Sequence, residues 1–249
     1  SPFPYKEEIA FFTLWQNGWL VDKEYIIYII IVISAIAALV WEIWRVKRVI
    51  TQFTDILYKK CDAEALLEIS KNGISYVPNR LYKNAGKADK KRKAMIIYFE
   101  RFYVEALNAK GRYAESLEYL EQHWESNRNA KVYVLLWQNV KLNLACEQGN
   151  KEEYQKIFMS AVLAIKQNKL MAAQKLYMEE NYKGAIELLE NMKVQVCYEK
   201  VCQSYKLAEC YMKQKKYDEA KECIKFVQEY GNTSVMKEKA LAMAEQMEN

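Results

Sequence analysis

Hydrophobic residues are distributed unevenly along the chain, with one dense apolar run near the start and an amphipathic pattern after it. The run from Tyr25 to Trp41 has 17 residues without a charge, and extending it to Trp44 gives 20 residues. A helix of that length spans about 30 Å, the thickness of a bilayer's hydrocarbon core. Aromatic residues at both ends match those found at the two membrane–water interfaces. The pattern therefore predicts a transmembrane helix within residues 23–48.

Two other structures could contain an apolar run of this kind. A buried core helix of a soluble protein is usually shorter, and this run has no polar face over its 17 uncharged residues. A cleaved signal peptide could use the small residues Ala35 and Ala37, but it begins with a short basic segment. Here 24 residues precede the run, and four of them are acidic. Both alternatives are therefore disfavoured.

The basic residues that flank the run predict its orientation. Lys6 and Lys23 precede it, whereas five basic residues follow it closely: Arg45, Lys47, Arg48, Lys59 and Lys60. Because Lys and Arg accumulate on the cytoplasmic side of a membrane helix, we expect the C-terminal part in the cytoplasm. Residues 1–22 then lie outside, as a short interfacial segment rich in Phe and Trp.

The six cysteines fit a reducing cytoplasm. They form no C-x-x-C pair and no metal-ligand spacing, so we expect small buried thiols rather than disulfides. The opposite orientation would permit disulfides, and it would also permit glycosylation at the sequon that begins with Asn232.

Residues 49–93 are expected to form linker helices and a basic loop. A short helix starts after Asp62 as its N-cap and ends at Gly73, and a loop covers 74–93. The basic residues of the loop are Arg80, Lys83, Lys87, Lys90, Lys91, Arg92 and Lys93. A solvated loop, attachment to an anionic membrane surface and nucleic-acid binding all fit such a run. Nucleic acid is disfavoured because no aromatic residues are interleaved with the charges.

Four similar segments follow, at 111–120, 149–158, 180–189 and 215–224, with a mean period of about 34–35 residues. Tyr113, Tyr182 and Tyr217 occupy equivalent places, and the second segment is shifted by about one residue. The fourth segment and the helix before it place apolar and small residues at a characteristic spacing: Leu207, Ala208, Tyr211, Tyr217, Ala220, Ile224 and Val227. This pattern resembles the tetratricopeptide repeat (TPR) family.

The resemblance implies that residues 94–249 form a right-handed superhelix of antiparallel helix pairs. The last helix, over 235–248, would cover the open end of the superhelix, and its apolar stripe consists of Met236, Ala240, Met243, Ala244 and Met247. A Met-rich helix that binds a partner is the alternative.

TPR domains bind peptides or helices of other proteins in a concave groove, so the resemblance also suggests where a partner would bind. The expected groove positions on the first helices of the repeats are Arg101, Glu105, Gln138, Asn139, Asn143, Gln174 and Lys206. A known TPR subset binds a C-terminal carboxylate with Lys and Asn. In this chain Glu105 occupies a place where that subset has Asn, so we expect no such carboxylate clamp.

Neither the composition nor the motifs of the sequence indicate a catalytic, nucleotide-binding or metal-binding site. Seven Gly and three Pro are too few for a β-rich fold, and a single histidine, His123, excludes a triad or a His-based metal site. No nucleotide-binding motif occurs. The net charge of +5 is concentrated in the basic segment, leaving the rest near neutral.

We therefore expect no enzyme and no cofactor, but a single-pass membrane protein with an all-α TPR-like domain that recruits a protein or peptide, including another membrane protein. An integral accessory subunit that packs through Ala35, Ala37 and Ala38, or a binder of lipid or nucleic acid, are the alternatives.

Overall fold

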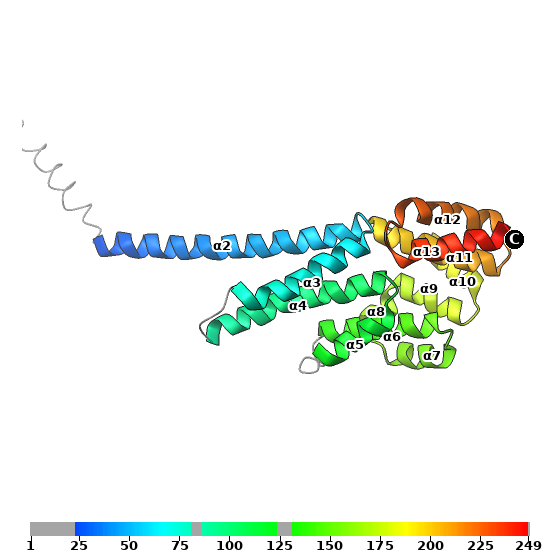
Figure 1. Ribbon diagram of the computed structural model, residues 1–249, viewed down its shortest axis with the longest axis horizontal. Coiled ribbons are helices and arrows are strands. Elements are labelled where there is room, and N and C mark those ends of the chain that lie inside the picture. The colour runs from blue at the N-terminus through cyan, green and yellow to red at the C-terminus, as the bar shows by residue number, and fades with distance from the viewer. Residues whose placement is uncertain (1–22, 81–85, 124–130, 249) are drawn as a thin grey trace, which may run out of the picture. The chain divides into compact units, whose positions relative to one another are not determined.

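The computed structural model describes residues 23–80, 86–123 and 131–248, and every regular element within these ranges is a helix (Figure 1). This confirms the expected all-α class. The chain divides into two compact units, residues 1–51 and 52–249, and each is described by itself.

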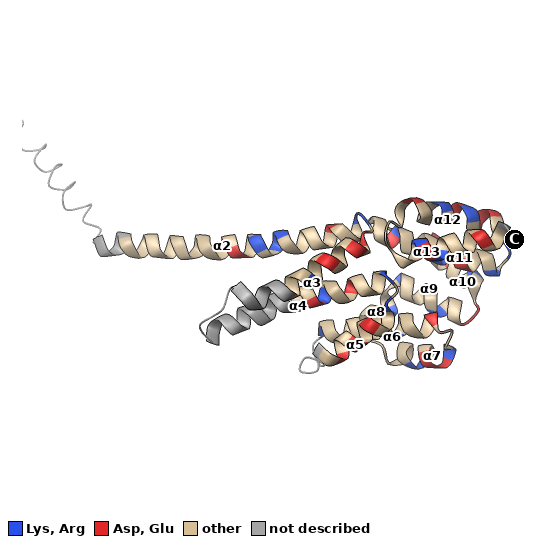
Figure 2. Ribbon diagram, viewed as in Figure 1, with Lys and Arg blue, Asp and Glu red and all other residues tan. Residues whose placement is uncertain are grey.

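The described part of the first unit is the N-terminal portion of helix α2, Lys23–Tyr58. The large apolar side chains between Ile27 and Trp44 are all at least 50% exposed, which is not the environment of a core helix. Figure 2 shows an uncharged stretch of α2 followed by an acidic and then several basic residues. Within the described residues, one helix is long and apolar enough to cross a membrane, with a mean hydropathy of 2.3.

The end of the apolar stretch contains a group of aromatic and basic side chains. The rings of Trp41 and Trp44 lie 5.5 Å apart, and the Arg48 guanidinium lies 5.4 Å from the Trp44 ring centroid. Arg45 forms an ion pair with Glu42 at 3.7 Å. This combination of Trp and Arg suits a membrane–water interface, where one part of the side chain is apolar and the other hydrated.

The second unit begins with the last turns of α2 and continues through a series of helices joined mostly by short turns. These are α3 Ala63–Arg80, α4 Gly86–Ala109, α5 Tyr113–His123, α6 Lys131–Glu147, α7 Lys151–Ser160, α8 Leu163–Gln167, α9 Lys169–Met178, α10 Tyr182–Glu190, α11 Cys197–Lys213, α12 Tyr217–Tyr230 and α13 Val235–Glu248. Helices that follow each other in sequence pack against each other, as in α3 with α4, α9 with α10 and α11 with α12.

Four of the turns share one backbone geometry, at the places where the sequence segments are similar. Gly111, Gly149, Glu180 and Lys215 have φ values of 71°, 64°, 61° and 60°. In each turn the next residue donates its backbone N–H to the carbonyl five residues earlier, at 2.8–2.9 Å. This is the bond that ends a helix at a left-handed residue. The turns are 38, 31 and 35 residues apart, so the period is regular only on average.

Small residues lie where the paired helices meet. Ala185, Ala208 and Ala220 are completely buried, and so is Ser116, which occupies in its segment the place of Ala185 and Ala220 in theirs. The Ser116 hydroxyl donates to the Val104 carbonyl at 3.4 Å, which satisfies its polar group inside the core. Close approach of the helices at these positions explains the small residues in the sequence.

The structure corrects the prediction for residues 63–93. Helix α3 continues through Gly73 to Arg80, and α4 already begins at Gly86, so most of the expected loop is helical. A Cβ at Gly73 would lie 2.5 Å from the Phe99 ring, so this glycine allows α4 to approach α3 rather than ending the helix. The basic residues are not tested, because Lys83 and the side chains of Arg80, Lys87, Lys90, Lys91, Arg92 and Lys93 lie outside the described residues.

The two ends of the second unit contact each other. The loop after α12 approaches the turn between α2 and α3: Asn232 Nδ2 donates to the Lys60 carbonyl at 2.9 Å, and Thr233 Oγ1 donates to Asp62 Oδ1 at 2.9 Å. The Glu64 N–H donates in turn to Thr233 Oγ1 at 3.0 Å. These residues are about 170 positions apart in the sequence.

Helix α13 takes part in this closure. Met236 and Ala240 are buried, and the other residues of the predicted stripe, Met243, Ala244 and Met247, pack partly buried against the same core. The stripe therefore packs against the core of the second unit. The expectation that α13 simply covers an open end is incomplete, because its first turn also approaches Gly111, between α4 and α5.

Candidate functional site

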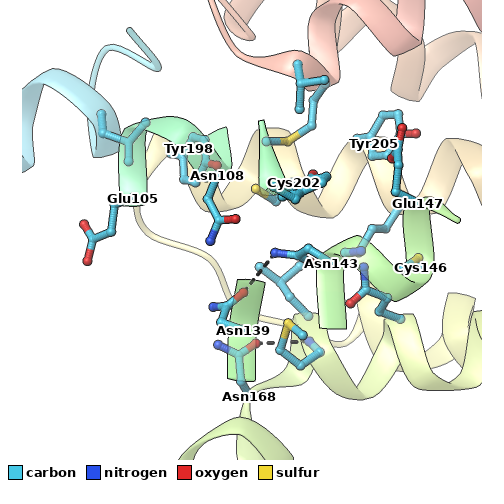
Figure 3. Close-up of a pocket in the computed structure, with 18 of the residues that line it drawn as sticks. Glu105, Asn108, Asn139, Asn143, Cys146, Glu147, Asn168, Tyr198, Cys202 and Tyr205 are labelled. Carbon is cyan, nitrogen blue, oxygen red and sulfur yellow. Dashed lines mark hydrogen bonds between the residues drawn. The ribbon is translucent and has the colours of Figure 1, made fainter. Parts of the chain in front are cut away.

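The second unit contains a cavity of about 590 Å³ (Figure 3). Its lining side chains come from the end of α2, from the first residue of α5, and from α4, α6, α9, α11 and α13. Its volume lies in the range of sites that accept a small molecule or a short stretch of a chain. The wall combines amides, charged groups and tyrosines with apolar side chains such as Leu135, Leu136 and Met171. Such a wall can bury an apolar group and orient a polar one.

Six of the seven positions expected to face a partner line this cavity. Arg101 and Glu105 come from α4, and the remaining four from later helices: Asn139, Asn143, Gln174 and Lys206. The sequence predicts these positions from the faces of the first helices of the repeats, and the packing of the helices brings them together.

The seventh position, Gln138, does not line the cavity. Its side chain is 7% exposed and is held by the turn between α7 and α8. The Val162 N–H donates to Gln138 Oε1 at 2.9 Å, and Gln138 Nε2 donates to the Ser160 carbonyl at 3.4 Å. Gln138 therefore joins α6 to the α7–α8 turn, whereas its neighbour Asn139 faces the cavity. Adjacent residues on a helix point in directions about 100° apart, which explains the difference.

A chain of hydrogen-bonded side chains crosses the cavity wall between α9 and α6. The Tyr154 hydroxyl donates to Gln174 Oε1 at 3.2 Å, Gln174 Nε2 donates to Asn143 Oδ1 at 3.3 Å, and Asn143 Nδ2 donates to Asn139 Oδ1 at 2.9 Å. Each amide is oriented by the one before it. The Asn139 amide N–H groups at the end of the chain have no acceptor among the described residues, so they are available as donors. A backbone carbonyl of a bound peptide is one acceptor that suits them.

On the α4 side, Arg101 Nε donates to Glu105 Oε1 at 2.8 Å. The Glu105 side chain is only 13% exposed, against 45% for Arg101. Burial raises the pKa of the Glu105 carboxyl, and the charge and hydrogen bond of Arg101 oppose that rise. The second carboxylate oxygen, Oε2, is buried without a hydrogen-bond donor among the described residues.

On the α11 side, the Tyr205 hydroxyl donates to Glu209 Oε1 at 2.7 Å. Burial raises the pKa of the Glu209 carboxyl, and the Lys206 ammonium opposes the rise. Glu147 forms an ion pair with Lys239 from α13. Lys206 itself has no ion pair or hydrogen bond within the described part of the chain.

Two cysteines also line the cavity. Burial raises the pKa of the Cys202 thiol to about 12, and burial raises the pKa of the Cys146 thiol as well. Both thiols are therefore protonated at neutral pH and act as apolar surface rather than as nucleophiles. The described residues contain no cluster of three His, Cys, Asp or Glu that could hold a metal ion. The side chain of His123 lies outside them.

Several cavity residues escaped the sequence analysis: Asn108, Glu147, Asn168, Tyr198, Tyr205, Glu209 and Lys239. Asn108 and Glu209 each follow a predicted residue by three positions, so they share its helix face and could have been found from that spacing. Lys239 has no such signal, because it reaches the cavity only through the closure by α13.

No family model matches the chain, and neither a curated protein nor a solved structure is significantly similar to it.

Proposed function

We propose that this protein is a membrane-anchored scaffold or adaptor of the TPR type, with the helical unit in the cytoplasm, which binds a peptide segment of a partner protein in its cavity. The observation that carries the proposal is the convergence of six groove positions, chosen from the repeat pattern, on one cavity. The four equivalent turns support the assignment to TPR-like repeats.

The cavity chemistry fits a peptide. An extended peptide presents carbonyl and N–H groups at regular intervals and carries apolar side chains between them. The Asn139 amide can donate to such a carbonyl, and Leu135, Leu136 and Met171 can bury an apolar side chain. The uncharged stretch of α2 and the basic residues after it support an anchor with its C-terminal side in the cytoplasm.

Site-specific photo-crosslinking in native membranes tests the proposal. A benzophenone amino acid at Leu135, which lines the cavity, is expected to cross-link to one defined partner protein. The same group at Leu241, an exposed α13 residue outside the cavity lining, is the matched control and should not. In the protein that carries the benzophenone amino acid at position 135, the additional substitution Asn139→Leu should weaken the cross-link. Equal cross-linking from both positions, or none from Leu135, would contradict the proposal.

A truncated chain separates an anchor from an accessory subunit. If the chain without residues 1–44 still cross-links through Leu135, the apolar helix serves only as an anchor. Loss of the cross-link in a chain that retains its helical content would favour an accessory subunit, whose membrane helix itself binds the partner.

A further inference from the structure

Two acceptor atoms without donors lie at the α4 end of the cavity. Among the described residues, the buried side-chain oxygens without a hydrogen-bond partner are Glu105 Oε2, Asn108 Oδ1 and Ser234 Oγ. Glu105 and Asn108 line the cavity, whereas Ser234 does not. Because they are three residues apart on α4, their side chains share one face of the helix.

Both atoms accept hydrogen bonds, so the missing group must be a donor. A buried carboxylate oxygen without a donor loses its hydration without compensation, and this loss is costly for a charged group. Arg101 donates a hydrogen bond only to Oε1 of the Glu105 carboxylate. The carboxylate has enough lone pairs to accept from a second cationic group as well. Since Arg101 is about half exposed, water screens its charge more strongly than that of Glu105.

Aromatic rings complete this end of the cavity. Tyr58 and Tyr198 both line it, with ring centroids 5.8 Å apart in an edge-on arrangement. Burial raises the pKa of the Tyr58 hydroxyl, and the charge of the nearby Glu105 carboxylate raises it further. A carboxylate beside aromatic rings suits an ammonium or guanidinium group. Such a group pairs with the carboxylate and is attracted to the faces of the aromatic rings.

The other carboxylates of the cavity already have partners. Glu147 pairs with Lys239, and Glu209 accepts from Tyr205 and lies near Lys206. Figure 3 shows Glu105, Asn108 and Tyr198 at one side of the cavity and Glu147, Cys146 and Tyr205 at the other. The free acceptors therefore mark one end.

We propose that this end, formed by Glu105, Asn108, Tyr58 and Tyr198, is a subsite for a basic side chain, the ammonium of a lysine or the guanidinium of an arginine, on the bound peptide. The inference rests on the proposed function and adds the chemical class of the ligand. The basic group donates to Glu105 Oε2 and Asn108 Oδ1, after a side-chain movement that lets it reach them, and it lies against the tyrosine rings.

Peptide selection tests the subsite. A phage library of short random peptides is selected on the full-length protein in lipid nanodiscs, once with the wild type and once with Glu105→Gln. Wild-type binders should share a Lys or Arg at one aligned position, and Glu105→Gln should remove this preference. Glu187→Gln, on the exposed surface of α10 and outside the cavity lining, is the matched control and should select the same basic residue as the wild type.

Fluorescence anisotropy then measures how the contribution of the basic residue to binding depends on Glu105. The probe is a labelled peptide selected on the wild-type protein. Replacing its conserved Lys by norleucine should weaken binding to the wild type about tenfold, the loss expected for a charge-assisted hydrogen bond. Binding to Glu105→Gln should hardly change on the same replacement. Asn108→Asp, which keeps an acceptor oxygen and adds charge, should retain or strengthen the preference for Lys.

The outcomes distinguish the two proposals. If no peptide binds the wild type, the proposed function fails. If peptides bind but share no basic residue, only the subsite proposal is wrong. The same holds if the replacement by norleucine weakens binding equally in the wild type and in Glu105→Gln. Water then satisfies the hydrogen-bonding capacity of the two oxygens. Circular dichroism of each variant shows that the helical fold is intact.

Discussion

The Cys61 thiol donates to the sulfur of Cys197, with the two sulfur atoms 3.5 Å apart although 136 residues separate them in the sequence. Cys61 is completely buried in the turn between α2 and α3, and Cys197 begins α11. This contact joins the start of the second unit to its C-terminal helices, next to the hydrogen bonds made by Asn232 and Thr233.

We predict that a small-molecule disulfide oxidant will cross-link this pair. Two thiols are oxidised to one disulfide, and the reagent's disulfide is reduced to two thiols. Burial raises the pKa of Cys61, so the reaction should be slow at neutral pH and faster at alkaline pH. Mass spectrometry of the non-reduced protein should identify the 61–197 peptide pair. The bond should raise the free energy of unfolding by up to about 5 kcal/mol in the chain-entropy model.

Cys61→Ser and Cys197→Ser should each abolish the cross-link, whereas Cys223→Ser is the control and should not. A cross-link that persists in Cys61→Ser would contradict the observed pairing.

The closure at Gly111 can be tested against an open turn of the same geometry. Gly111 and Gly149 both have positive φ, but a Cβ at Gly111 would lie 2.7 Å from Val235, whereas nothing lies within 4 Å at Gly149. Gly149→Ala should cost about 1–2 kcal/mol for the left-handed backbone, and Gly111→Ala about 2–4 kcal/mol because overpacking is added. Chemical denaturation measures both.

Val235→Ala should recover part of the loss in Gly111→Ala and none of it in Gly149→Ala. Equal costs for the two glycine substitutions would show that α13 does not pack on this turn.

Two neighbouring residues of α6 should separate stability from binding. Gln138→Leu leaves the partly buried Val162 N–H without its acceptor and should lower the free energy of unfolding by about 1–3 kcal/mol. Asn139→Leu should change it by less than about 1 kcal/mol, because its bond to Asn143 lies in the partly exposed cavity wall. Peptide binding should weaken in Asn139→Leu. The opposite ranking of the two variants in denaturation experiments would be inconsistent with the observed contacts.

Burial of Glu209 should make stability depend on pH. Its pKa is raised by burial and by the charge of Glu147, while Lys206, Lys239 and the Tyr205 hydroxyl oppose this rise. A carboxyl with a raised folded-state pKa stabilises the fold most when protonated, and this contribution is lost as pH rises through that pKa. Glu209→Gln, which keeps an acceptor for Tyr205, should therefore gain stability relative to the wild type near pH 7.

The advantage of Glu209→Gln should shrink as the pH falls toward about 4, the ordinary range of a Glu side chain. Thermal unfolding of both proteins across that range is the measurement, and a difference that is independent of pH would exclude a burial effect.

The membrane orientation requires engineered cysteines. Cys146 and Cys223 are both partly buried, so failure of a thiol reagent to reach them would reflect packing as well as the membrane. Lys221→Cys, on the exposed surface of α12, should react with an impermeant maleimide only after the cells are permeabilised. Lys6→Cys should react in intact cells. Labelling of Lys221→Cys from outside would reverse the proposed topology, and the unmodified protein provides the background.

Local patterns were enough to predict much of the helical unit. Helix faces in α4, α6, α9 and α11 depend on spacing within one helix, and they placed Arg101, Asn143 and Lys206 among the cavity residues. The similar segments 180–189 and 215–224 begin at turns that lack glycine, at Glu180 and Lys215, and they are recognised because the residues that follow these turns repeat. Gln138 does not line the cavity, because its hydrogen-bond partners lie on another segment, which no helix face reveals.

The sequence by itself determined the elements: an apolar stretch long enough to span a membrane, helices of amphipathic period and similar turns between pairs of them. These follow from interactions between residues a few positions apart. The tertiary structure decided what depends on contacts between distant residues: that Gly73 permits close packing, that α13 and Thr233 close the second unit, and that Glu105 Oε2 and Asn108 Oδ1 are buried without a donor among the described residues. Burial and close approach are properties of the packed chain, so their consequences appear only there.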